Sequence, residues 1–150
     1  MEYRLYKPED FTPLYAIEEV CFQPPHRFGK GYMRMLLKQA DGAAWIAERD
    51  GAMCGFGIVE WGAADVGAMA YVQTLEVLPE ARGAGAGSEL LRRLEGSAKD
   101  AGAVVIWLHV DAENGGAIRV YERSGYGVCG KEPDYYGRGR AGLVYAKQLD

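Results

Sequence analysis

The sequence has few cysteines, no long apolar run and little net charge, and each of these absences narrows the possible functions. Cys21, Cys54 and Cys129 are odd in number and widely spaced, without a C-x-x-C pair, which argues against a disulfide framework and a zinc cluster. No stretch approaches the ~18 apolar residues of a membrane span, and the first residues lack an apolar signal core. With a net charge of −4, the surface as a whole does not attract nucleic acid. We therefore expect a cytoplasmic protein with neither membrane nor nucleic-acid partners.

Glycine, by contrast, is abundant: it supplies 21 of the 150 residues, about double the usual ~7%. The glycines have no every-third-residue period, which excludes collagen, and they are not gathered in one tract as in a flexible linker. With 49% apolar residues the chain can bury one core, and no internal repeat or linker divides it. These features predict a single folded domain over residues 1–150.

The first half of the sequence alternates strand and helix signals. Residues 2–6 predict a strand, and Pro8 followed by two acidic residues predicts the first turn of a helix. Leu14, Ile17 and Val20, three residues apart, should supply the buried face of this helix. The other elements predicted here are a helix over 31–39, strands over 43–48 and 53–61 joined by a type I′ turn at Asp50-Gly51, and a strand over 67–78.

The second half has the strand–helix–strand order of a layered α/β protein. A helical stripe over 90–101 ends at Gly102, and the apolar run over 104–108 predicts a strand buried on both faces. A further helix should begin at an Asn114 cap and end at Gly125. The last strands predicted are 126–129 and 143–147. The expected fold is α/β, with a central mixed, twisted sheet of six to seven strands flanked by about four helices.

A glycine-rich segment between a strand and a helix carries the clearest functional signal. Gly83, Gly85 and Gly87 occupy alternate positions, so successive backbone N–H groups can turn toward one point, and the following helix adds its positive end. Such a cradle suits a phosphate or pyrophosphate. The dinucleotide-binding fingerprint fails because the sixth position from Gly83 is Ser88, and the Gly-Lys-Ser/Thr of a P-loop is missing.

Three spaced motifs resemble those of the GNAT N-acetyltransferases, a family that binds acetyl-coenzyme A. Arg82-x-x-Gly85-x-Gly87 is similar to that family's R/Q-x-x-G-x-G/A loop, and Asn114–Tyr126 is similar to its N-x-x-A-I-x-x-Y-E-x-x-G-F/Y stretch. Asp134-Tyr135-Tyr136 resembles the N-Y-Y element of the protein N-terminal acetyltransferases. The resemblance covers roughly half the chain. It implies a single GNAT fold and an acetyl-coenzyme A-dependent transfer without a metal.

The resemblance also implies which residues hold the coenzyme. Backbone groups of Leu75, Glu76 and Val77 would contact the pantetheine arm, and Asn114 would approach it from the opposite side. The pyrophosphate would lie on a loop made of Arg82, Gly83, Ala84, Gly85, Ala86, Gly87 and Ser88. A splayed strand has unpaired amides, so a linear pantetheine can add to it as a pseudo-strand.

Acetyl transfer needs a neutral amine, and His109 is the leading candidate for the group that assists its deprotonation. His109 ends a predicted strand, where open α/β sheets place their ligands. The NatE-type N-terminal acetyltransferases resemble this chain in their Y-x-x-T-L and L-H-V segments, here Tyr71–Leu75 and Leu108–Val110. That resemblance assigns a proton relay to the Tyr71 and His109 pair. It makes Tyr121 the partner of the departing thiolate. The ribosomal-protein-alanine acetyltransferases are also similar here but carry Glu at position 109.

Structural roles would also explain these side chains. A single histidine on a strand can be a solvated or core residue, and Tyr71 could cap an apolar face. Tyr121 lies at helical spacing among apolar residues, so packing alone accounts for it. The Glu76 side chain is expected to be solvated or structural rather than a base.

The acceptor is expected to lie between two aromatic walls. Phe22, Pro24, Phe28 and Tyr32 occur in and beside the predicted helix–helix connection, where this family builds one wall, and Tyr135 and Tyr136 would form the other. The walls suit a peptide N-terminal α-amine, and they suit a small amine or amino-acid derivative equally well. A non-catalytic acyl-coenzyme A sensor is a third reading. The sequence leaves monomer and homodimer both open.

Overall fold

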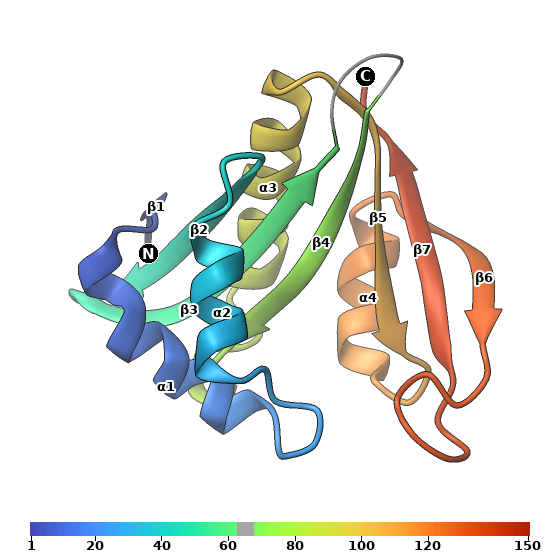
Figure 1. Cartoon of the computed structure of the whole chain (residues 1–150), viewed down its shortest axis with the longest axis horizontal. Coiled ribbons are helices and arrows are strands. Elements are labelled where there is room, and N and C mark those ends of the chain that lie inside the picture. Colours follow the sequence, from blue (N-terminus) through green and yellow to red (C-terminus); the bar gives the residue numbers. More distant parts are fainter. Residues whose placement is uncertain (63–67) are drawn as a thin grey trace.

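Seven strands and four α-helices make up the described part of the chain, residues 1–62 and 68–150, in the computed structural model (Figure 1). The strands are β1 (Glu2–Leu5), β2 (Gly42–Arg49), β3 (Ala52–Trp61), β4 (Ala68–Val77), β5 (Ala103–Asp111), β6 (Gly127–Glu132) and β7 (Gly142–Gln148). The α-helices are α1 (Phe11–Cys21), α2 (Lys30–Leu37), α3 (Ala86–Asp100) and α4 (Gly115–Arg123), and 3-10 turns cover Pro8–Asp10 and Pro79–Ala81. The α/β fold predicted from the sequence is confirmed.

All the strands join one mixed sheet in the order β1-β2-β3-β4-β5-β7-β6. Neighbouring strands are antiparallel except β4 and β5, which run parallel and are connected through α3. A parallel pair needs a long crossover, and the helix over 86–100 supplies it. The predicted strand over 67–78 is observed as β4 from Ala68 onward, while Gly67 lies outside the described residues.

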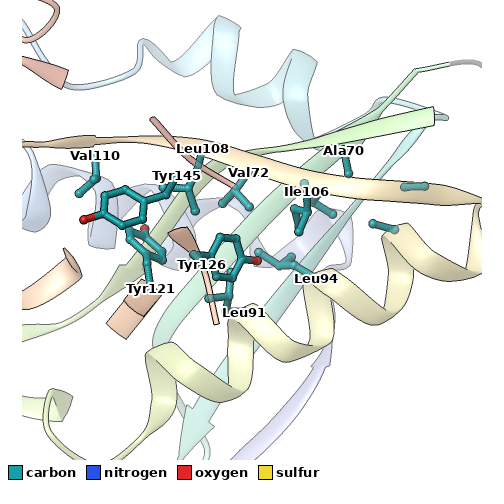
Figure 2. Packing of buried hydrophobic residues seen from close by; sticks show 13 residues of the cluster. Ala70, Val72, Leu91, Leu94, Ile106, Leu108, Val110, Tyr121, Tyr126 and Tyr145 are labelled. Atoms are coloured by element: carbon teal, nitrogen blue, oxygen red, sulfur yellow. The ribbon is translucent and has the colours of Figure 1, made fainter. Parts of the chain in front are cut away.

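The helices cover the two faces of the sheet unequally (Figure 1). α1 and α2 pack on one face, where Phe56 and Ile58 of β3 are buried against them. On the other face, α3 and α4 cover a second core that includes Leu91 and Leu94. Figure 2 shows the tyrosines of this second core, Tyr121, Tyr126 and Tyr145, beside the leucines of α3. No helix in the described ranges is long and apolar enough to cross a membrane.

The hairpin between β2 and β3 has the predicted type I′ turn. Both central residues have positive φ, 53° at Asp50 and 80° at Gly51. These values are those of a type I′ turn, whose twist matches that of the paired strands. The turn type predicted from the Asp50-Gly51 pair is therefore correct.

Two burial predictions are wrong. Val20 is 54% exposed, because a helix turns about 100° per residue and Val20 lies about 120° around the axis from Leu14. β5 is buried on one face only: Ile106 and Leu108 lie under α3 and α4, whereas Trp107 on the opposite face is partly exposed. The apolar run over 104–108 wrongly predicted burial on both faces. α1 and α2 cover β2 and β3 and leave this face of β5 to aromatic side chains.

Candidate active site

The parallel strands β4 and β5 separate toward their C-terminal ends. They pair from Ala68 and Ala103 as far as Tyr71 and Trp107, and no pairing joins them beyond that point. β4 also carries a bulge, since its register with β3 shifts by one residue between the pairs that flank Gln73. The backbone of the last residues of β4 is consequently open on the side that faces β5, as the splayed-strand prediction requires.

A cavity of about 480 Å³ lies where the strands diverge, between the end of β4, the loop before α3, and α4. It collects the residues that the sequence predicts for the coenzyme, namely Leu75, Glu76, Val77, Arg82, Gly83, Gly85, Ala86, Gly87, Ser88, Asn114 and Tyr121. Ala84 is not among the residues that line it. The Asn114 side chain also caps α4, because its Oδ1 accepts the Ala117 N–H at 3.1 Å.

The glycine loop adopts the conformation of an anion cradle. Gly83 and Gly85 have φ of +83° and +86°, a left-handed backbone that other residues rarely adopt. A Cβ at either position would meet no atom within 4 Å, so the surface above the loop is open. Gly85 is the N-cap of α3, whose first N–H groups and positive end add to the loop amides. A pyrophosphate fits this arrangement.

Sequence reasoning assigned no site role to several residues of the cavity wall, and three of these carry a charged or thiol side chain. Arg119 and Arg123 project from α4 across from the glycine loop, and Cys21 lies at the end of α1. The sequence feature that could have indicated the two arginines is their four-residue spacing, which places both on one face of the helix. Phe22, predicted for the acceptor wall, lines this cavity as well. The two guanidinium groups make the cavity more favourable for phosphate than the loop alone does.

Tyr71 and His109 meet beside the diverging strands. The Tyr71 hydroxyl lies 2.8 Å from His109 Nδ1, and the edge of the Trp107 ring packs on Tyr71 with centroids 4.5 Å apart. Burial, reinforced by the neighbouring Tyr135, raises the pKa of Tyr71 far above its ordinary value. Tyr71 is therefore a neutral phenol at physiological pH, and it can pass a proton but not act as a standing phenolate.

The second nitrogen of His109 has a partner that the sequence did not reveal. His109 Nε2 lies 3.1 Å from Glu132 Oε1, so a carboxyl group, an imidazole and a phenol form one chain of contacts. Glu132 belongs to no recognised motif; only the pairing of β6 and β7 beside β5 brings it here. The ring of Tyr135 stacks on the imidazole at 4.2 Å with an interplanar angle of 9°.

Tyr121 is buried in the core and at the same time lines the cavity (Figure 2). Its ring packs near Tyr126, with centroids 6.0 Å apart. Burial raises its pKa well above the ordinary value, so its hydroxyl stays protonated. The packing role and the cavity position predicted for Tyr121 are both observed.

The two predicted aromatic walls lie on separate segments that come together at one point. On the α1–α2 side, Phe28 and Tyr32 pack edge to face with centroids 5.2 Å apart. On the β6–β7 side, Tyr135 and Tyr136 pack likewise at 4.9 Å. The two sides meet where the ring of Tyr136 lies 6.4 Å from that of His26. Pro24 is exposed in the α1–α2 connection.

A pair of buried carboxyl groups links these two regions. Glu18 of α1 and Glu76 of β4 are only 1% and 3% exposed. One oxygen of Glu18 accepts the Phe28 N–H at 2.9 Å, and one oxygen of Glu76 accepts the Thr74 hydroxyl at 2.6 Å. The other oxygen of each has no conventional partner in the described part of the chain. Burial and the nearby Glu18 raise the pKa of Glu76 well above its usual range. The pair therefore shares a proton, and the solvated position considered for Glu76 is wrong.

Comparison with known proteins identifies the family. The Acetyltransferase (GNAT) family matches residues 17–126, more than half of the chain, so this chain belongs to the GNAT acetyltransferases. A streptothricin acetyltransferase of Streptomyces lavendulae is 33% identical over 100 residues, which cover 66% of this chain and 52% of that protein. A mycothiol acetyltransferase of Streptomyces coelicolor is 38% identical over 86 residues, or 55% of this chain and 26% of that protein. The chain thus spans about half or less of the length of these relatives.

The fold is shared with a solved N-acetyltransferase. The ribosomal-protein-S18-alanine N-acetyltransferase from Escherichia coli superimposes with a TM-score of 0.85 over 99% of this chain and 94% of that one. The two sequences are 20% identical. At this identity the likeness establishes the architecture, and the acceptor has to be argued from the residues of the site.

The shared proton predicts how Glu76→Gln changes stability with pH. Because the folded state holds this proton more tightly than the unfolded chain does, the contribution of Glu76 is full below the ordinary glutamate pKa and decreases as the pH rises. Glutamine keeps an N–H donor and does not titrate. The difference in free energy of unfolding, variant minus wild type, should therefore increase with rising pH, by at most about 1.4 kcal/mol per pH unit.

Urea unfolding between about pH 5 and pH 8 measures this difference. Glu80→Gln removes an exposed carboxylate from the adjoining turn and serves as the matched control, with a difference that stays flat. A constant offset between Glu76→Gln and the wild type over the whole range would contradict the shared proton.

Proposed function

We propose that this protein transfers the acetyl group of acetyl-coenzyme A to a primary amine, and that the acceptor is a peptide N-terminal α-amine. The observation that carries the proposal is the 2.8 Å contact between the Tyr71 hydroxyl and His109 Nδ1, next to the opening between β4 and β5. It puts a proton acceptor behind a neutral phenol where β4 and β5 begin to diverge, and the residues that line the cavity begin further along β4, at Leu75. Family membership supports the transfer.

Different residues around the cavity would bind different parts of the coenzyme. The amides of the glycine loop and the start of α3 would hold the pyrophosphate, with Arg119 and Arg123 opposite. The unpaired end of β4, from Leu75 to Val77, would bind the pantetheine arm as an added strand. When bound there, acetyl-coenzyme A supplies a thioester carbonyl carbon that an amine can attack.

The proton chemistry favours an α-amine. A peptide α-amine has a pKa of about 7.7–8 and is partly neutral at physiological pH, whereas alkyl amines near ~10 are almost fully protonated. As the amine nitrogen forms its bond to the acetyl carbon, Tyr71 accepts the amine proton, directly or through water, and gives its own proton to His109 Nδ1. An imidazole is a base of suitable strength for this task.

Tyr121 completes the proton balance. Cleavage of the bond between carbon and sulfur leaves a thiolate, to which the protonated Tyr121 hydroxyl donates at the cavity wall. The proton held on His109 returns to solvent, and Tyr121 is reprotonated. The net change is one amide and one thiol formed from one amine and one thioester. Because Tyr121 is buried, its pKa is high, and it donates readily only to a strong base such as a desolvated thiolate.

An acceptor panel tests the proposed substrate class. We expect thiol release from acetyl-coenzyme A with short peptides that carry a free α-amine, and at least tenfold less with the same peptides blocked at the N-terminus and carrying an internal lysine. Thiol-reactive dye and mass spectrometry of the product give the rate and the acetylated nitrogen. Turnover with small amines alone would overturn the peptide assignment.

A small-molecule amine is the second candidate acceptor, because the relative with 33% identity is a streptothricin acetyltransferase. Streptothricin and amino-acid amides in the same panel separate this candidate from the first. Tight coenzyme binding without turnover on any amine would instead support the non-catalytic sensor.

Removing either member of the relay should slow the transfer. We expect His109→Gln and Tyr71→Phe each to lower kcat by about 10²–10⁴-fold, with a KM for acetyl-coenzyme A close to wild type. Both variants should lose the acidic limb of the pH–rate profile, because His109→Gln removes the base and Tyr71→Phe disconnects it from the amine. Lys99→Gln, exposed near the end of α3 and away from the site, is the control. Unchanged profiles in both relay variants would move the base elsewhere.

The left-handed loop glycine gives a prediction for the coenzyme alone. Gly85→Ala forces an L side chain into φ of +86°, which costs about 1–2 kcal/mol, so the affinity for coenzyme A should fall about 5–30-fold. Gly96→Ala, in the middle of α3 with open space around its Cβ, is the matched control and should bind as the wild type does. Isothermal titration calorimetry measures both, and equal affinities would contradict the cradle.

A further inference from the structure

We infer that Glu132 is a positioning residue that fixes the tautomer of His109 and stabilises its charged form during the transfer. The inference rests on the proposed function in one respect, that His109 is the proton acceptor. It goes beyond the motif-based assignment, because nothing in the glycine loop, the Asn114 stretch or the tyrosine pair marks Glu132. It depends on the 3.1 Å contact between His109 Nε2 and Glu132 Oε1.

The contact between Glu132 and His109 determines the direction of both hydrogen bonds that link Glu132, His109 and Tyr71. An ionised carboxylate has no proton and can only accept, so His109 Nε2 must carry the hydrogen. In the neutral ring Nδ1 is then the acceptor, and the Tyr71 hydroxyl donates to it. With its hydrogen engaged, the phenol oxygen presents its lone pairs to an incoming amine. The opposite tautomer would turn the Tyr71 hydrogen toward the acceptor and block the relay.

Among the described residues, Glu132 is the one charged side chain in hydrogen-bond contact with His109. Tyr71 faces the ring from β4, Trp107 from β5 and Tyr135 from the β6–β7 segment, and all are uncharged. Glu60 of β3 is a more distant carboxylate that acts on Tyr71. Within the described residues, His109 is the sole ion-pair partner of Glu132.

Proton transfer makes this arrangement more favourable. When the Tyr71 hydrogen moves to Nδ1, the ring becomes an imidazolium with a donor on each nitrogen, one toward Tyr71 and one toward Glu132. The amine proton moves to the Tyr71 oxygen at the same time, so one amine N–H bond and the Tyr71 O–H bond are broken while a new O–H bond on Tyr71 and an N–H bond on Nδ1 are formed. The imidazolium–carboxylate contact is a charge-assisted hydrogen bond that exists at full strength only after the transfer. The Glu132 side chain is 51% exposed, so solvent moderates the effect.

Gly142 leaves the space in which Tyr135 stacks on the His109 ring. A Cβ at this buried position of β7 would lie 2.9 Å from Tyr135 Cβ and 3.0 Å from its ring. The absent side chain thus lets Tyr135 lie flat on one face of the imidazole while Glu132 reaches its edge. Ring orientation is then set by a stack, a carboxylate and a phenol together.

Two substitutions at Glu132 separate geometry from charge. Glu132→Gln keeps an oxygen that can accept from Nε2, whereas Glu132→Ala removes both the acceptor and the charge. Nitrogen-15 NMR of the imidazole rings reports the tautomer without any substrate. The chain has two histidines, so the His26→Gln variant assigns the His109 signals. We expect the Nε2–H tautomer in the wild type and in Glu132→Gln, and a mixture in Glu132→Ala.

The split between kcat and KM gives the second readout. Both variants remove the charge that would form a charge-assisted hydrogen bond with the imidazolium, so they should lower kcat about 3–10-fold, with an unchanged KM for acetyl-coenzyme A. Lys131→Gln, the exposed neighbour on β6, is the matched control and should keep the wild-type kcat.

The outcomes distinguish this inference from the proposed function. An Nδ1–H tautomer in the wild type, or a Glu132→Ala variant with the wild-type tautomer and kcat, would overturn the role of Glu132 while transfer to amines continued. If no amine were acetylated, the proposed function would fail, and the tautomer measurement would still test the contact between Glu132 and His109.

Discussion

The separation of β4 from β5 beyond Tyr71 and Trp107 is the constraint on which the rest of the structure depends. Two parallel strands that stayed paired would satisfy each other's backbone groups and leave no room between them. Because they diverge, one side of β4 is open, the cavity forms beside it, and α4 closes the far wall. His109 stands on the face of β5 that α1 and α2 leave only partly covered.

Burial at this opening determines the chemical character of each tyrosine. Tyr71 and Tyr121 both have pKa values raised by desolvation, so both are neutral acids at physiological pH. A neutral phenol is useful in two ways: it relays a proton when a base lies behind it, and it protonates a strong base in front of it. Tyr71 has His109 behind it, whereas Tyr121 lines the cavity and has no hydrogen bond to a basic side chain within the described residues. The same side chain can therefore serve both sides of one transfer.

Local patterns predicted the features that depend on local chemistry. The Asp50-Gly51 turn and the Asn114 cap each follow from the conformational preference of one or two residues, and each is observed. Of the three glycines predicted to form the cradle, Gly83 and Gly85 are left-handed, whereas Gly87 lies within α3. The periodicity of apolar residues also predicted the strands of the sheet and the helices that flank it. It failed where burial depends on another element: the apolar run of β5 could not reveal that α1 and α2 cover a different part of the sheet. Glu132 was missed for the same reason, since the register of three strands brings it to His109.

The buried Glu18 and Glu76 pair shows how the coenzyme strand and the acceptor segment are connected. Glu76 lines the cavity together with its neighbours Leu75 and Val77, and Glu18 holds the Phe28 amide in the segment that leads into α2. Two carboxyl groups buried together cannot both be ionised without a large cost, so a proton between them is the lower-energy state. The proton held by this pair therefore links β4 to α1, and the Phe28 amide links α1 to the segment before α2.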